Sequence, residues 1–126
     1  MKKFISMLVV TFLLLTAAQS QEKKQWKEMH DFHAVMSSTF HPAEDGNLQP
    51  IRSRSQEMYD KAVSWNKSDA PEGYDKEAVK KSLKKLVGGS KEINKLVKEN
   101  AEDKVLTEKL TALHDVFHEI MEKCRK

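Results

Sequence analysis

The chain is 126 residues long and carries 22 lysines and arginines against 19 aspartates and glutamates. This length suffices for a single compact domain with one hydrophobic core. The near balance of charge argues against a nucleic-acid-binding protein, because phosphate contacts need a clear excess of basic residues. With a single cysteine, Cys124, the chain cannot form an internal disulfide.

The first twenty residues have the pattern of an export signal. Lys2 and Lys3 precede an apolar run over 4–15 that is too short to span a bilayer, and small residues follow at 17–20. We therefore expect a signal peptide at 1–20 and a mature domain at 21–126, located in the periplasm or secreted. Removal of the two lysines leaves 20 basic against 19 acidic residues. No cysteine lies near the cleavage site, so we expect no membrane anchor after cleavage.

Two segments with helical periodicity open the mature chain. The first is predicted to end at His41, because proline disfavours helix in the residue before it. The second has a capping residue in Asn47 and a proline, Pro50, in its first turn, where a missing amide is harmless. Apolar residues at spacings of three and four predict the buried faces: Trp26, Met29, His33, Met36 and Phe40 in the first segment, and Leu48, Ile51, Ser55, Met58, Ala62 and Trp65 in the second.

Two further segments repeat this pattern. The third contains Gly88 and Gly89, which cost about 1 kcal/mol each in a helix and predict either close approach of a neighbour or a kink. Its many lysines lie away from the apolar face and are interpreted as a solvated surface. The fourth is predicted to begin near Asn100 or Asp103. The buried faces are Val79, Leu83, Leu86, Ser90, Ile93 and Val97, then Leu106, Leu110, Leu113, Phe117, Ile120 and Cys124.

No segment shows the alternation of a β-strand, and no repeat is present. Four amphipathic helices joined by short loops predict an all-α fold, an antiparallel up-down-up-down four-helix bundle. In that topology the first and last helices lie side by side, and this proximity carries the prediction of function.

Four of the five histidines lie on those two helices. His30 and His33 are three residues apart, and His114 and His118 are four apart, so each pair occupies one helix face. Matching the ends of the antiparallel helices sets His33 level with His114, and a heptad count from Trp26 turns His33 inward. The sequence therefore predicts a metal site formed by three or four histidines.

Neutral imidazole is the commonest transition-metal ligand, and a histidine shell suits zinc or copper(II). Met29, Met36 and Met121 flank the predicted site, and their thioethers favour copper slightly, although such residues are also common core fillers. The first prediction is thus an exported protein for metal buffering or delivery. The fifth histidine, His41, is expected to pair with Glu44 or Asp45 at the turn.

The mature length, the export signal and the Phe117-His118 step resemble the periplasmic four-helix bundles of the soluble b-type cytochrome and cytochrome c-prime kind. This resemblance implies a haem iron held by Met29 (or His30) from the first helix and His118 from the last. No Cys-x-x-Cys-His motif is present, so covalent attachment is excluded. A non-covalent haem electron carrier is the alternative function, and a structural or interaction bundle without a cofactor is the third.

An enzyme is not expected. The sequence shows no Ser/His/Asp or Cys/His constellation and no glycine-rich phosphate loop, since Gly88 and Gly89 fall within a predicted helix. Cys124 is predicted to be a buried core residue, with metal ligation or an intermolecular disulfide that would make a homodimer as the alternatives.

Overall fold

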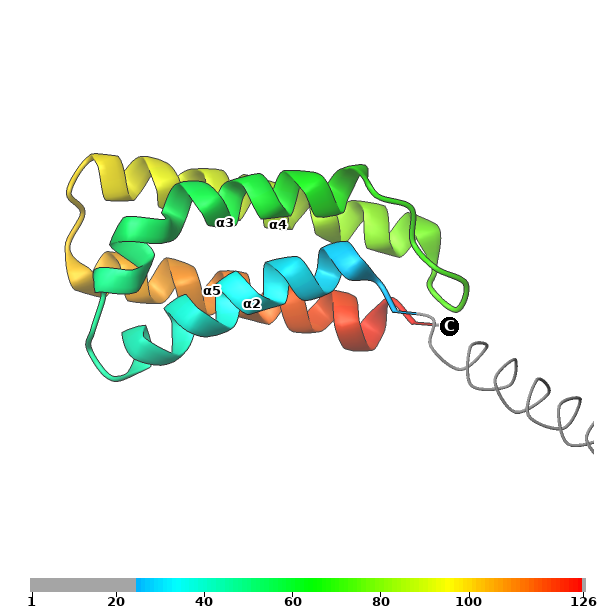
Figure 1. Ribbon diagram of the computed structural model, residues 1–126, viewed down its shortest axis with the longest axis horizontal. Coiled ribbons are helices and arrows are strands. Elements are labelled where there is room, and N and C mark those ends of the chain that lie inside the picture. The colour runs from blue at the N-terminus through cyan, green and yellow to red at the C-terminus, as the bar shows by residue number, and fades with distance from the viewer. Residues whose placement is uncertain (1–24, 126) are drawn as a thin grey trace, which may run out of the picture.

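Four helices make up most of the protein in a computed structural model that describes residues 25–125 (Figure 1). They are α2 (Lys27–Glu44), α3 (Gln49–Lys67), α4 (Lys76–Lys98) and α5 (Asp103–Lys123). Within 25–125 no helix is long and apolar enough to cross a membrane. The predicted signal peptide, at 1–20, lies outside the described residues.

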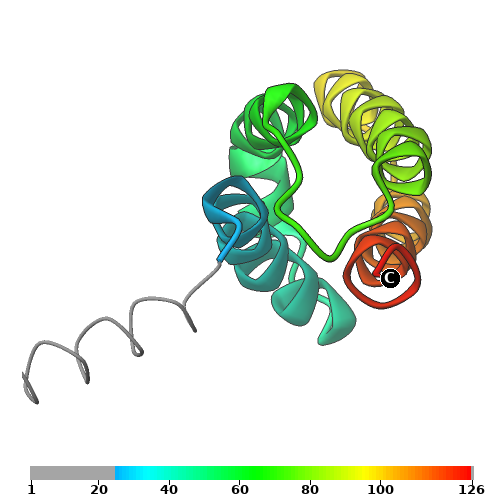
Figure 2. The ribbon, with the colours of Figure 1, turned by 90° about the vertical axis from the view of Figure 1, so that its right-hand side faces the viewer.

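The helices form an all-α four-helix bundle. Figure 2, which looks along the bundle, shows them arranged as a ring around a central core. Each helix contacts the next in the chain, and α5 closes the ring against α2 along the sparsest of the four seams. The loops between consecutive helices span 45–48, 68–75 and 99–102, and they are short enough to keep consecutive helices adjacent.

The predicted buried faces of α3, α4 and α5 are confirmed, apart from Val97, which is only partly buried. Three aromatic rings from three helices pack together in the core. Phe32 from α2, Trp65 from α3 and Phe117 from α5 lie within 5.5 to 6.0 Å of one another, centroid to centroid. Burial of these large side chains supplies much of the hydrophobic stabilisation.

One position on the inward face of α2 differs from the prediction. Phe32 is fully buried, whereas His33 is exposed. The other predicted positions are confirmed as buried: Trp26, Met29, Met36 and Phe40. A spacing of three from Met29 reaches Phe32 and a spacing of four reaches His33, and both spacings suit a helix face. The prediction that His33 points inward is wrong.

The helix also continues past His41 and Pro42 to Glu44. Proline is tolerated in this last turn because the hydrogen bond that it removes lies at the helix end, and the Pro42 carbonyl accepts from the backbone amides of Asp45 and Asn47 (3.0 and 2.9 Å).

Neither predicted cap lies at the cap position itself. The cap residue of α3 is Leu48, which makes no side-chain cap bond. Asn47 lies one residue earlier, and its side-chain oxygen accepts from the backbone amide of Gln49 at 3.1 Å. Asn100 instead adopts the left-handed conformation (φ 56°) that ends α4. The cap residue of α5 is Glu102, and Asp103 is already its first helical residue.

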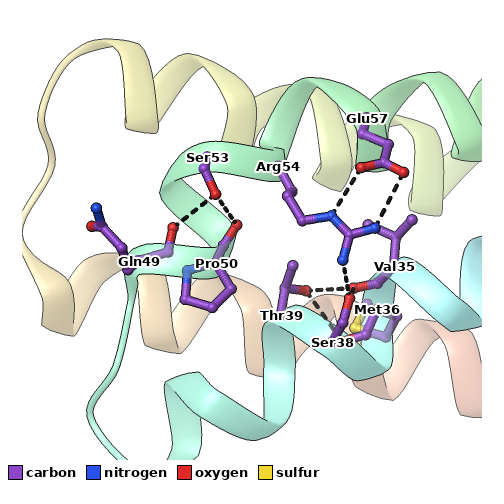
Figure 3. Close-up of polar contacts among 9 residues, drawn as sticks. All are labelled: Val35, Met36, Ser38, Thr39, Gln49, Pro50, Ser53, Arg54 and Glu57. Atoms are coloured by element: carbon purple, nitrogen blue, oxygen red, sulfur yellow. Dashed lines mark hydrogen bonds and ion pairs between the residues drawn. The ribbon is translucent and has the colours of Figure 1, made fainter.

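A polar clasp joins α2 to α3 (Figure 3). The guanidinium of Arg54 pairs with Glu57 at 2.9 and 3.2 Å on its own helix and donates to the Ser38 hydroxyl on α2. Beside it, the Thr39 hydroxyl donates to the carbonyl of Val35 at 2.9 Å, which satisfies a polar group buried in the seam.

A second clasp holds the chain's last described residues. The backbone amide of Asp75 donates to the Cys124 carbonyl at 2.7 Å, and the Arg125 guanidinium lies over the Tyr74 ring. The Cys124 thiol is buried, as predicted. A disulfide between two chains through this thiol would require the C-terminal turn to open.

Candidate metal site between α2 and α5

His114 and His118 lie together on α5, both half-buried at the seam with α2. Their spacing of four residues places the rings one turn apart on one helix face. The two Nε2 atoms are 3.2 Å apart, and the ring centroids are 4.5 Å apart at an interplanar angle of 70°. The rings thus meet edge to face, with the same nitrogen of each turned toward the other.

Two phenylalanines fix this arrangement. The Phe40 ring of α2 stacks on His114, with centroids 4.0 Å apart and an interplanar angle of 11°. Phe117 lies 5.8 Å from the His118 ring. Because Phe40 and Phe117 are buried in the core, the imidazoles are oriented by side chains that have little freedom themselves.

A carboxylate lies beside the other nitrogen of His118. Its Nδ1 is 3.4 Å from Oε1 of Glu122, one turn further along α5. This contact favours the tautomer with the proton on Nδ1, which leaves a lone pair on Nε2. Histidines that ligate metals commonly have such a carboxylate on the non-ligating nitrogen.

The electrostatics of the seam favour neutral imidazole. Burial lowers the pKa of His114, and the positive charge that His118 and His41 carry when protonated lowers it further, against the opposing effects of Asp115 and Glu44. A metal ligand must be unprotonated, so this shift widens the pH range over which His114 can bind an ion.

The separation of the two nitrogens suits a shared ion. Nitrogens that bind one ion at about 2.0–2.1 Å lie roughly 3.3 Å apart at a tetrahedral angle, roughly 2.9 Å apart at a right angle and roughly 4.1 Å apart in a linear arrangement. The observed 3.2 Å is close to the tetrahedral value. The pair could therefore occupy two neighbouring positions of a coordination shell.

The other predicted ligands lie elsewhere. His30 and His33 are exposed, and His33 stacks on Phe117 with centroids 5.0 Å apart. No hydrogen bond or ring contact joins either residue to His114 or His118. Among residues 25–125, no group of three or more histidines, cysteines, aspartates or glutamates is placed to hold a metal ion. The predicted three- or four-histidine cluster is thus not formed in this structure.

Side-chain direction explains the difference. Ring contacts of the two helices run in opposite order, since His33 meets Phe117 whereas Phe40, later in α2, meets His114. Side chains on a helix lean toward its N-terminus. On two helices whose contacts run in opposite order, rings attached at the same height therefore lean away from each other. Placing the backbones of His33 and His114 at the same height thus does not bring their rings together.

Two residues at the end of α2 belong to the surroundings of the pair. His41 Nδ1 is 3.2 Å from Glu44 Oε1, which confirms the expected pairing. Both residues lie close enough to influence the pKa of His114. The sequence prediction placed both residues at a turn, with a second, weaker metal site as the alternative for His41, and it assigned neither Phe40 nor Glu122 to the main site. The four-residue spacing of His118 and Glu122 was the available signal for the latter.

The predicted haem ligands Met29 and His118 make other contacts in the structure. The sulfur of Met29, the predicted axial ligand, accepts from the Tyr74 hydroxyl at 3.9 Å. The contacting rings of Phe32, Trp65 and Phe117 fill the core behind the seam, where a porphyrin would need an apolar slot.

Comparison with known proteins gives no relative from which a ligand could be transferred. The resemblance to b-type cytochromes and cytochrome c-prime rests on sequence features alone and stays a prediction. No protein-family model, no curated protein and no solved structure matches this chain.

Proposed function

We propose that this protein binds a transition-metal ion through Nε2 of His114 and Nε2 of His118. The observation that carries the proposal is the 3.2 Å approach of these two atoms, with Glu122 engaged at the opposite nitrogen of His118. Two nitrogen lone pairs facing each other repel unless a proton or a metal ion lies between them. A proton on one Nε2 satisfies the pair in the metal-free state, and an ion replaces it.

Zinc and copper(II) are the ions that two imidazoles favour. The near-tetrahedral separation supports zinc, whereas the intrinsic affinity order supports copper(II). Two protein ligands leave other coordination positions for water or for donors of another molecule. A site of this kind exchanges its ion readily and suits buffering or delivery rather than a closed structural role. His41 and Glu44 are the nearest candidates for a further ligand.

The setting that we propose is extracytoplasmic, because the pattern at 1–20 is that of an export signal. The opposite order of the α2 and α5 ring contacts supports the antiparallel up-down-up-down arrangement. The role is binding without catalysis.

The test is a titration of metal-free protein with Zn²⁺ and, separately, Cu²⁺ against a chromophoric chelator. We expect one equivalent to bind, and the variant His114→Ala/His118→Ala to lose that binding while its helical circular dichroism is unchanged. The matched control is His30→Ala/His33→Ala, which also removes two histidines, but from exposed positions of α2. This variant is expected to bind the metal ion as the native protein does.

Absence of binding by the native protein, or unchanged affinity in the His114/His118 variant, would refute the proposal. A further variant, His41→Ala/Glu44→Gln, addresses the third ligand. Weaker binding in this variant would assign a ligand to the end of α2, and unchanged binding would assign the open positions to water.

A further inference from the structure

A row of lysines follows the outer face of α4. We define the basic stripe as six residues that are all exposed: Lys76, Lys80, Lys84, Lys91, Lys95 and Lys98. At 3.6 residues per turn they fall within an arc of about 100°, over a length of about 33 Å. Glu77, at the first turn, is the one acidic residue of α4 in the same arc.

None of these six ammonium groups has an ion-pair or hydrogen-bond partner among residues 25–125. The ion pairs of α4 involve Lys85, bound to Glu119 at 3.6 Å, and Glu92, bound to Lys109 at 2.9 Å. Both pairs face α5, beside the stripe and not within it. The charge of the stripe is therefore not neutralised within the described part of the chain.

Charge is also distributed unevenly over the molecule. Helix α4 holds eight lysines and two glutamates, a net charge of +6. The rest of 25–125 holds nine lysines and arginines against sixteen acidic residues, a net charge of −7. Screening at physiological salt acts over about 8 Å, so a partner at α4 experiences the local positive charge more than the overall balance.

A groove opens beside the middle of the stripe, between α3 and α4. It has a volume of about 530 Å³, and its lining includes Tyr59, Gly88, Lys91 and Lys95. Gly88 contributes no side chain and has open space where a Cβ would be. The lysine stems and the tyrosine ring give apolar walls below a rim of ammonium groups.

We propose that the basic stripe docks the protein peripherally on an anionic phospholipid membrane. A predominantly basic helix face matches a flat anionic surface, and lysines act as point charges that need no fixed partner geometry, unlike the planar arginine fork. The groove has room for the apolar part of a lipid next to its headgroup. The stripe lies on the outer face of α4, away from the α2–α5 seam that holds His114 and His118, so docking leaves that pair accessible. The inference does not depend on metal binding.

The test is co-sedimentation of residues 21–126 with vesicles of phosphatidylglycerol and phosphatidylcholine, and with vesicles of phosphatidylcholine alone. We expect binding to the anionic vesicles only, with loss of binding between about 0.05 M and about 0.5 M salt. The variant Lys84→Gln/Lys91→Gln/Lys95→Gln is expected to weaken binding at least about tenfold.

The control for net charge is Lys67→Gln/Lys104→Gln/Lys123→Gln, which removes the same charge from exposed positions outside α4 and is expected to bind within about twofold of the native protein. Equal weakening in both variants would refute a role for the stripe, as would absence of vesicle binding. Tighter binding to duplex DNA or to polyglutamate than to vesicles, measured by fluorescence anisotropy, would also overturn the assignment of a membrane.

Discussion

The two adjacent glycines of α4 should respond oppositely to the same substitution. Both lie inside a continuous helix, where replacing glycine by alanine gains about 0.5–1 kcal/mol from backbone entropy. At Gly88 an added Cβ would have no atom within 4 Å. We therefore expect Gly88→Ala to raise the free energy of unfolding by the whole of that gain.

At Gly89 the added Cβ would lie 2.8 Å from Cδ1 of Leu113 on α5. Leu113 is buried, so its side chain must move to admit the Cβ, and overpacking of this kind costs about 1–3 kcal/mol. Subtracting the helical gain gives a net destabilisation between about zero and about 2.5 kcal/mol. The two variants should thus differ by about 1–3 kcal/mol.

The assay is urea unfolding followed by circular dichroism, with thermal melts as a second measurement, in which 1 kcal/mol corresponds to about 4 °C or more for a domain of this size. The double variant Gly89→Ala/Leu113→Val removes the clashing methyl and should be more stable than the sum of the two single changes predicts. Equal stabilisation by Gly88→Ala and Gly89→Ala would refute the close approach of α4 to α5.

Three further predictions concern the histidine seam and the thiol. Because the pKa of His114 is lowered in the folded protein, the unfolded chain binds the proton more readily. Urea unfolding of the metal-free protein should therefore show a free energy of unfolding that falls below about pH 6.5 and levels off above it. The variant His114→Gln should flatten this pH dependence, and an unchanged profile would contradict the lowered pKa. The variant Glu122→Gln should weaken metal binding by about threefold to tenfold, a small effect for such a carboxylate because the Glu122 side chain is 67% exposed. The control Glu108→Gln, also at an exposed position, should leave metal affinity unchanged. Equal metal affinity of Glu122→Gln and the native protein would argue against orientation of His118 by Glu122. Cys124 should react slowly with a thiol reagent until denaturant is added, and rapid labelling of the native protein would show that its buried position is not maintained.

Helical periodicity predicted the local structure well. Spacings of three and four placed Ile51, Leu86 and Leu110 in the core, and each is fully buried. Asn47 and Pro50 indicated where α3 begins, because capping and proline chemistry act over a few residues of chain. These features depend on neighbours in sequence, so the sequence alone determined them.

Errors arose where the sequence pattern allowed two choices. Positions three and four after Met29 both suit the inward face, and the prediction took His33 where the structure buries Phe32. Asn100 suits either the end of one helix or the start of the next, and it ends α4 in the left-handed conformation. The packing of the neighbouring helices decides between such choices.

The sequence by itself determined that there are four amphipathic helices and that His114 and His118 share one face, since a spacing of four fixes that proximity on any α-helix. Only the tertiary structure decided which α2 residues meet them. Side chains lean toward the N-terminus of their own helix, and the contacts of α2 and α5 run in opposite order. As a result Phe40 contacts His114, and His33 contacts Phe117. Contacts between helices depend on the relative height and rotation of two rods, and no pattern within either rod specifies these.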